Sequence, residues 1–206
     1  MGTRGVYGIR KNGQDKLTYN HWDSYPEHLG YQMAVTCSKA SNEELNKIFD
    51  NIKLVGADDK PTKKMIQTCE QAGYINLNVG RHSMADVYCL THGAQGEPQK
   101  WLDDLKAGRT IYMIDDSGFL YNGLFCEFAY IINLDTNMLE FLVGFQDEPT
   151  EGNRYGCEPR PDHSGRNWYP CKCILEIPLD SINNIEGAKN AVELMFEADQ
   201  KEFQEK

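Results

Sequence analysis

The chain has 206 residues, of which 40% are hydrophobic, so it can bury one sizeable core and we expect a single domain over residues 1–206. Asp and Glu total 31 against 21 Lys and Arg, which gives a formal net charge of -10. A surface of this sign repels phosphate backbones, and no local basic patch offsets it, so direct nucleic-acid binding is not expected. No stretch approaches the roughly 18 apolar residues of a membrane helix, so we expect no membrane association.

Cysteine usage indicates a reducing compartment. The seven cysteines are an odd set, and the N-terminus lacks the charged region and apolar stretch of a secretory signal. We therefore expect reduced thiols in a cytoplasmic protein. Four potential zinc ligands lie close together in the sequence: Cys157, His163, Cys171 and Cys173. Their spacing matches no standard zinc site, so we expect neither a metal nor another cofactor.

The N-terminal residues are predicted to form a β-hairpin. Residues 6–11 and 16–22 are rich in aromatic and β-branched side chains, and Asn12-Gly13 between them is a two-residue turn signal. Pairing about this turn places complementary residues opposite each other: Arg10 with Asp15, Val6 with Tyr19, and Gly8 with Leu17. The same register, continued, predicts three further pairs: Arg4 with His21, Thr3 with Trp22, and Gly2 with Asp23.

Helical signals fill the central part of the chain. Residues 24–30 are predicted to be a polar turn that leads into mostly helical sequence. Ser41 and Glu44 form a capping box, and apolar residues then recur at helical spacing as far as Ile52. Further helices are expected after Pro61, over residues 85–91 and after Pro98.

The pattern changes to strands after residue 110. Strands are predicted over residues 110–114, 124–134, 138–145 and 172–177, with a hairpin loop at Asp135-Thr136-Asn137. An antiparallel sheet follows from this pattern, and residues 188–196 give a closing amphipathic helix. The fold class is therefore α+β, with an N-terminal β-hairpin, central helices, an antiparallel sheet and a C-terminal helix. Residues 146–170 form a long irregular insertion, either a binding loop or a flexible excursion.

The segment NHWDSYPEHLG, residues 20–30, concentrates polar and aromatic side chains at the end of the hairpin. Loops held by a rigid hairpin commonly carry function. Trp22 and Tyr25 are suited to stacking on a flat ligand such as a base or sugar, and Asp23 to binding hydroxyls or an amine. The alternative is a turn whose aromatic side chains fill the core.

Glu127 is a second candidate, because it interrupts the apolar run LFCEFAYIINL. A carboxylate in a strand that is buried on both faces must be paired or face a cavity, and its pKa is then suited to acid or base work. The alternative is that Glu127 points outward from a half-exposed edge. Cys126 before it should face the other way, and no motif lowers the pKa of its thiol.

Familiar catalytic motifs are missing from the sequence. It has neither a Walker pattern nor a properly placed GxGxxG, and GxSxG and HExxH are also absent.

The pieces MGTRG, HWDSYP, CEFAYIINLD and LEFLVGF together resemble a group of uncharacterised short proteins encoded by phages and bacteria. The matching pieces cover residues 1–30 and about 84–145. The resemblance implies a phage or prophage origin, and hence the cytoplasm of a bacterial host. It implies no particular activity.

The hairpin opening is also similar to that of N-terminal nucleophile hydrolases, which place polar residues beside the chain terminus. In that class the nucleophile is the mature first residue, because its amine serves as the base. Thr3 is the only hydroxyl near this terminus, and exposing it requires the loss of Gly2 as well as Met1.

Two hypotheses follow. The first is a phage-type accessory protein, including a counter-defence role, that binds a basic host protein or a small nucleotide-like ligand through Arg4, Trp22, Asp23 and Tyr25. The alternative is a small hydrolase acting on an amide or a phosphoanhydride, with its site at the N-terminal hairpin. Its candidate catalytic residues are Thr3, His21, Asp23 and Glu127.

Overall fold

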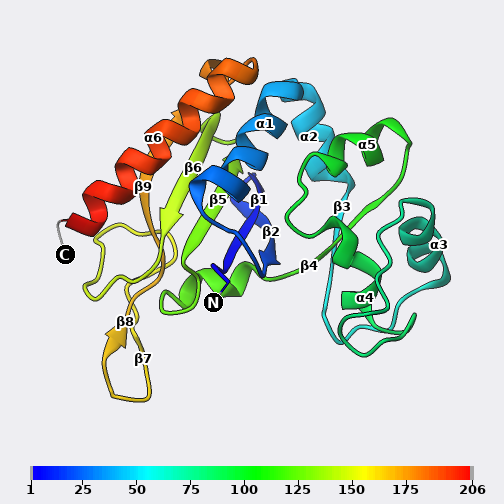
Figure 1. The fold of residues 1–206 in the computed structure, drawn as a ribbon, viewed down its shortest axis with the longest axis horizontal. Helices are drawn as coiled ribbons and strands as arrows, with labels where there is room; N and C mark the ends of the chain where they lie inside the picture. The colour runs from blue at the N-terminus through cyan, green and yellow to red at the C-terminus, as the bar shows by residue number, and fades with distance from the viewer. Residues whose placement is uncertain (1, 205–206) are drawn as a thin grey trace.

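A five-stranded mixed sheet forms the centre of the computed structural model, which describes residues 2–204 (Figure 1). Its strands, in the order β2-β1-β5-β6-β9, are Gln14–Asn20, Gly5–Lys11, Phe128–Asn133, Met138–Val143 and Lys172–Pro178. The α+β class is confirmed, and β5, β6 and β9 pair antiparallel as predicted. A parallel pairing of β1 with β5 joins the N-terminal hairpin to the later strands.

The hairpin β1–β2 has the predicted register from end to end of its ladder. Asn12 and Gly13 both have positive φ, at 52° and 73°, as the two central residues of a tight hairpin turn require. Arg10 pairs with Asp15 across the strands, and its Nη1 lies 2.9 Å from the Asp15 carboxylate. The ladder ends at Gly5 and Asn20.

Two helices cover one face of the sheet, α1 (Tyr31–Lys39) and α6 (Ile185–Gln204), which lie against each other (Figure 1). The prediction of a polar turn over residues 24–30 is partly wrong, because Pro26–Gly30 is one π-helical turn (η1) that runs directly into α1. Leu29 is fully buried there, so burial of an apolar side chain stabilises the extra helical turn. Among the described residues, no helix has the length and apolar character needed to span a membrane.

A smaller group of elements lies beside the sheet, around the parallel pair β3 and β4 (Figure 1). It comprises α2 (Asn42–Asn51), β3 (Ile52–Val55), α3 (Lys63–Gln71), α4 (Val87–Thr91), the 3₁₀ turn η2 (His92–Ala94), α5 (Lys100–Lys106) and β4 (Ile111–Ile114). The capping box of α2 is confirmed, since Ser41 and Glu44 exchange side-chain and backbone hydrogen bonds. Ile52, expected to continue this helix, instead begins β3.

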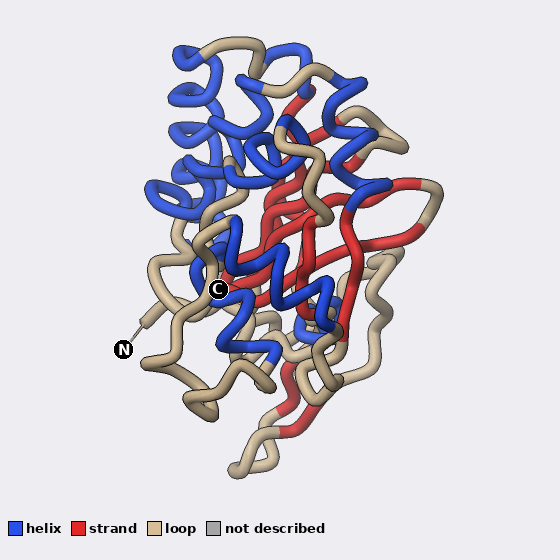
Figure 2. The backbone as a smooth tube through the Cα atoms, turned by 90° about the vertical axis from the view of Figure 1, so that its right-hand side faces the viewer, coloured by secondary structure: helices blue, strands red, loops and turns tan. Residues whose placement is uncertain are grey.

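The opposite face of the sheet is covered by η3 (Ser117–Tyr121) and by the insertion. The insertion carries a short hairpin, β7 (Arg160–Pro161) with β8 (Asn167–Trp168), and after β9 the turn η4 (Leu179–Ser181) leads to α6. Figure 2 shows the strands running through the middle of the molecule and the β7–β8 hairpin projecting from one end. The strand predicted over residues 124–134 is shorter at its start, because residues 122–126 form a helical turn.

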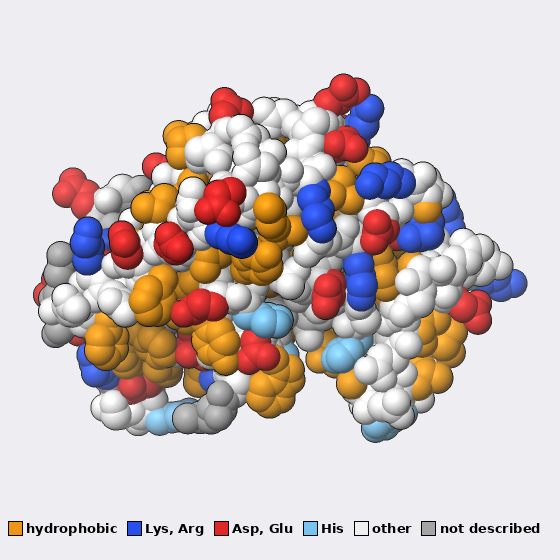
Figure 3. Space-filling view, turned by 45° about the horizontal axis from the view of Figure 1, so that its top comes forward, with side chains coloured by type: hydrophobic (Ala, Val, Ile, Leu, Met, Phe, Trp, Pro, Cys, Tyr) orange, Lys and Arg blue, Asp and Glu red, His pale blue; other side chains and the backbone are white. Residues whose placement is uncertain are grey.

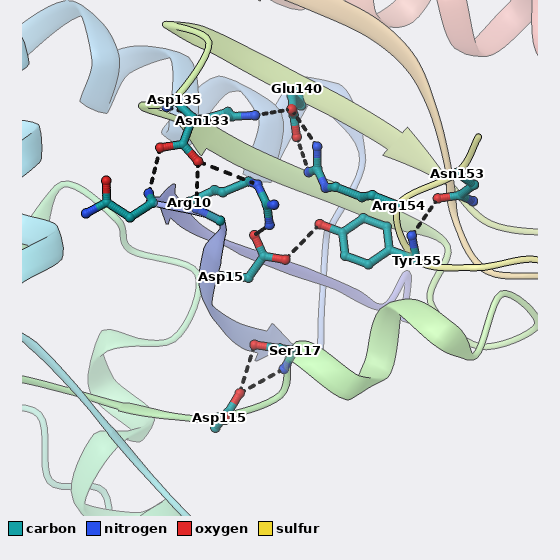
Figure 4. Close-up of polar contacts among 12 residues, drawn as sticks. Arg10, Asp15, Asp115, Ser117, Asn133, Asp135, Glu140, Asn153, Arg154 and Tyr155 are labelled. Atoms are coloured by element: carbon teal, nitrogen blue, oxygen red, sulfur yellow. Dashed lines mark hydrogen bonds and ion pairs between the residues drawn. The ribbon is translucent and has the colours of Figure 1, made fainter.

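A buried ion pair fixes the insertion to the sheet (Figure 4). The side chain of Glu140 on β6 is 1% exposed and pairs with the guanidinium of Arg154 through both carboxylate oxygens. Asn133 on β5 donates a third hydrogen bond to Glu140 at 2.6 Å. A buried carboxylate requires such partners, because water no longer solvates it. The insertion is therefore anchored by charge.

The polar contacts continue around a ring that crosses the sheet (Figure 4). Arg154 lies 4.8 Å from the ring centre of Tyr155, whose hydroxyl donates to Asp15 at 3.1 Å. Asp15 pairs with Arg10, and Arg10 lies 3.9 Å from Asp135. The backbone N–H of Asp135 donates to Asn133, which closes the ring. Four strands and the insertion are thus linked by charged groups.

Candidate ligand-binding site

The open end of the hairpin departs from the predicted register beyond Gly5. The backbone N–H of Ser24 donates to the carbonyl of Thr3 at 3.2 Å, so Thr3 lies opposite Ser24 and the predicted pairing with Trp22 is wrong. Asn20 causes this change, because its side-chain amide bonds to the Trp22 carbonyl and to the Ser24 hydroxyl in place of further ladder bonds. Asp23 has a φ of 53°, which turns the chain.

Gly2 packs directly under the indole of Trp22. A Cβ built on Gly2 would lie 2.0 Å from a carbon of that ring, so only glycine allows this approach. Gly2 therefore covers part of the Trp22 ring, and Trp22 is nevertheless 59% exposed.

Thr3, Tyr25 and Asp23 form one hydrogen-bonded chain. The Tyr25 hydroxyl donates to Asp23 at 2.8 Å and is bonded to the Thr3 side chain. The hydrogen bond to Asp23, and then its charge, raise the pKa of Tyr25. Asp23 is therefore engaged with Tyr25, and Thr3 contacts the same hydroxyl.

Glu127 is held by the backbone of the N-terminal strand. It lies one residue before β5, half-buried, and its carboxylate accepts the Arg4 backbone N–H at 3.0 Å. Its own N–H donates to the Arg4 carbonyl at 2.9 Å. The Glu127 carboxylate was predicted to need a partner, and its partner is the backbone N–H of Arg4. Cys126 beside it is buried in the opposite face, and burial followed by contact with Cys171 raises the pKa of its thiol.

The guanidinium of Arg4 lies over an exposed aromatic ring. Its central carbon is 4.8 Å from the ring centre of Phe125, and the Phe125 residue is 39% exposed. Of the seven arginines, five form ion pairs with carboxylates: Arg10, Arg81, Arg109, Arg154 and Arg166. Within residues 2–204, Arg4 has no carboxylate within ion-pair distance, although the protein is strongly acidic. Its positive charge is therefore available to an anion from outside the chain.

His21 and His92 approach each other from separate parts of the chain. His21 follows β2, and its Nδ1 lies 2.9 Å from the hydroxyl of Tyr19. His92 opens η2, and its Nδ1 lies 3.3 Å from the side-chain nitrogen of Asn76. Burial, and then the charge of His21, lower the pKa of His92. The two imidazoles are thus close enough to act on each other.

Gln95 joins the segment that carries His92 to the N-terminal hairpin. Its side chain donates to the Tyr19 carbonyl at 3.1 Å and is bonded to the hydroxyl of Tyr88 on α4. Figure 3 shows a notch in the surface with histidine side chains on both sides of it. We define the hairpin-end site by Arg4, His21, Trp22, Tyr25 and Phe125 on one side and by Tyr88 and His92 on the other.

The four potential zinc ligands do not meet. Cys171 is buried, and its thiol donates to the Cys126 carbonyl at 3.4 Å, whereas Cys157, His163 and Cys173 are exposed residues. In the part of the chain that the structure describes, no three His, Cys, Asp or Glu side chains are grouped to hold a metal ion.

Comparisons with protein-family models, with curated proteins and with solved structures find no match to this chain. The resemblance to short phage and bacterial proteins therefore stays a prediction, and the geometry of the hairpin-end site carries the functional argument.

Proposed function

We propose that the protein binds a small ligand that combines a flat ring with an anionic group, such as a nucleotide, at the hairpin-end site. The observation that carries this proposal is the position of Arg4: an unpaired guanidinium on the exposed ring of Phe125 in a protein of net charge -10. A guanidinium supplies several N–H donors in a plane, which suits phosphate and carboxylate oxygens.

Exposed aromatic rings of the hairpin-end site supply the other half of the recognition. Trp22 is 59% exposed and Tyr25 is 40% exposed. Stacking on such rings contributes roughly 1–3 kcal/mol per base in proteins that bind single strands. The edge of the His21 ring, 4.5 Å from the Trp22 ring centre to centre and nearly perpendicular to it, limits the motion of the indole.

The hydrogen bonds of the candidate catalytic groups favour binding over turnover. Asp23 is bonded to Tyr25, Glu127 to the Arg4 backbone, and His21 to Tyr19. Thr3 is bonded to Tyr25, and among the described residues no hydrogen bond joins any two of Thr3, His21, Asp23 and Glu127. A hydrolase needs a nucleophile and a base in mutual contact.

Calorimetric titration with adenosine 5′-monophosphate tests the proposal. We expect Arg4→Ala to weaken binding about tenfold or more, since a hydrogen bond to a charged group contributes roughly 1.5–3 kcal/mol. Arg81→Ala is the matched control, because Arg81 is another exposed arginine but is paired with Asp58. Equal affinity in both variants, or no binding by the wild type at millimolar concentration, would contradict the proposal.

A basic protein partner is a second candidate, and we propose it for an adjoining groove that shares Tyr25 with the hairpin-end site. An open groove of about 520 Å³ next to Tyr25 is lined by the aromatic rings of Phe128 and Phe196 and bordered by Glu27 and Asp199. Apolar walls with acidic borders fit a basic segment that carries a large apolar side chain. In a phage-infected cell such a partner would be a host factor, which includes components of host defence.

Salt dependence tests this second candidate with a lysine-rich peptide that contains phenylalanine. We expect binding to weaken as salt rises through the screening range, and Phe196→Ser to reduce it severalfold. Leu194→Ser is the control, because Leu194 is exposed on the same helix but outside the groove. Binding that strengthens with salt would contradict an electrostatic contribution, and equal loss in both variants would contradict the groove.

A further inference from the structure

Both imidazoles of the hairpin-end site make a polar contact through Nδ1. Tyr19 contacts Nδ1 of His21, and Asn76 contacts Nδ1 of His92. Each imidazole also meets an aromatic ring edge to face, Trp22 for His21 and Tyr88 for His92, with ring centres 4.5 and 5.3 Å apart. Among the described residues, no hydrogen bond uses Nε2 of either ring. The Asn76 side-chain nitrogen donates to Nδ1 of His92, which places the proton of the neutral ring on Nε2.

The charged and titratable groups around His92 come from several elements. The hairpin contributes His21 and Tyr19, and α4 contributes Tyr88. Lys100 on α5 donates from its ammonium to the carbonyl of Gly93 in η2. Arg4 lies on the hairpin side and acts electrostatically on Tyr19. The carboxylate of Asp86 caps α4 and accepts the Arg81 backbone N–H, so it is already engaged. Asp116 also acts electrostatically on Tyr19, and its carboxylate accepts the Tyr19 backbone N–H at 2.9 Å. Both of these carboxylates are therefore already engaged by hydrogen-bond donors.

We propose that His21 and His92 together hold a phosphate monoester group of the ligand through Nε2 and take up a proton when it binds. This inference rests on the proposed small-ligand function and narrows its ligand to a ring-bearing phosphate monoester. A dianionic phosphate has three acceptor oxygens, enough for both imidazoles and for Arg4. A phosphodiester or a carboxylate carries one negative charge and therefore attracts a protonated His92 and Arg4 less strongly.

The proton uptake follows from the sign of the pKa shift. Burial and the nearby His21 lower the pKa of His92, so in the unliganded protein the ring is neutral near pH 7. A dianion beside it favours the protonated form and raises that pKa again. The complex therefore binds more protons than its separate components, and affinity increases as pH falls toward about 6.5, above the second phosphate pKa near 6.

The test is calorimetric titration with adenosine 5′-monophosphate in two buffers of different ionisation heat. We expect net proton uptake by the wild type, and binding roughly threefold or more tighter at about pH 6.5 than at about pH 7.5. His21→Gln and His92→Gln should abolish the uptake and weaken binding. His28→Gln is the control, since His28 is an exposed histidine on η1 outside the site. Cyclic 3′,5′-AMP, a monoanionic diester, should bind more weakly and with less uptake.

The outcomes separate this inference from the proposed function. If Arg4→Ala abolishes binding of the monophosphate but the wild type takes up no proton and both histidine variants keep full affinity, the phosphate assignment is wrong and the binding function stands. If the monophosphate and the cyclic diester bind equally, the monoester specificity is wrong. If Arg4→Ala binds as the wild type does, the proposed function itself fails. Melting temperatures of each variant identify any that do not fold.

Discussion

Replacing Arg154 with alanine is expected to lower the free energy of unfolding by about 3 kcal/mol, as typically occurs when one partner of a buried ion pair is removed. The side chain of Glu140 is 1% exposed, and Arg154 provides two of its three side-chain hydrogen bonds. The alanine variant leaves this carboxylate buried with Asn133 alone. We place the value at the low end of the usual range because the Arg154 side chain is 30% exposed, so water reaches the gap. Chemical denaturation measures the change.

A matched control exists in the same insertion. Arg166 pairs with Asp147, but both side chains are about half exposed, so Arg166→Ala should cost less than about 1 kcal/mol. The double variant Glu140→Leu with Arg154→Met should lose less than Arg154→Ala, because it removes the buried charge together with its partner. A similar small loss for Arg154→Ala and Arg166→Ala would show that the pair does not anchor the insertion.

Gly8→Val is expected to destabilise the protein by about 3 kcal/mol, the upper part of the range for overpacking. Gly8 is buried on β1 between β2 and β5, and a Cβ there would lie 2.0 Å from the Lys16 carbonyl oxygen. That oxygen belongs to the backbone of β2, so the strands themselves must move apart. The same Cβ would also lie 2.8 Å from the side chain of Leu17, a residue of the core.

Gly118→Ala tests whether loss of glycine by itself explains the effect. Nothing lies within 4 Å of a Cβ at Gly118, so this substitution should leave stability within about 0.5 kcal/mol. Thermal or urea unfolding of both variants gives the comparison. A Gly8→Val protein as stable as Gly118→Ala would mean that β1 and β2 are not packed as closely as the structure shows.

Local signals in the sequence predicted most of the secondary structure. Asn12-Gly13 determined the register of the hairpin because positive φ at both positions permits a single kind of turn. Ser41 and Glu44 located the start of α2 because their hydrogen bonds are local. The parallel pairing of β1 with β5 joins residues more than a hundred positions apart, and no local pattern reports such a partner.

The candidate site was only half predictable for the same reason. Trp22 and Tyr25 belong to one continuous segment, residues 20–30, whose aromatic and charged composition stands out, and the hairpin register assigned Arg4 to the same end. His92 and Tyr88 reach the site from a distant segment through contacts with Gln95, and neither belongs to a recognisable motif. The predicted register was wrong beyond Gly5 because hydrogen bonds of the Asn20 side chain end the ladder there. The alternation of residues along a strand does not predict such side-chain bonds.

Binding at the hairpin-end site is tested most directly by nuclear magnetic resonance of the three tryptophan indole groups during titration with adenosine 5′-monophosphate. Trp22 is 59% exposed in the site, whereas Trp101 is 2% exposed in the core. The indole signal of Trp22, identified by its loss in Trp22→Phe, should shift progressively and saturate, while that of Trp101 stays unchanged. An unchanged Trp22 signal at millimolar nucleotide, or a shift of equal size in Arg4→Ala, would contradict the proposed site.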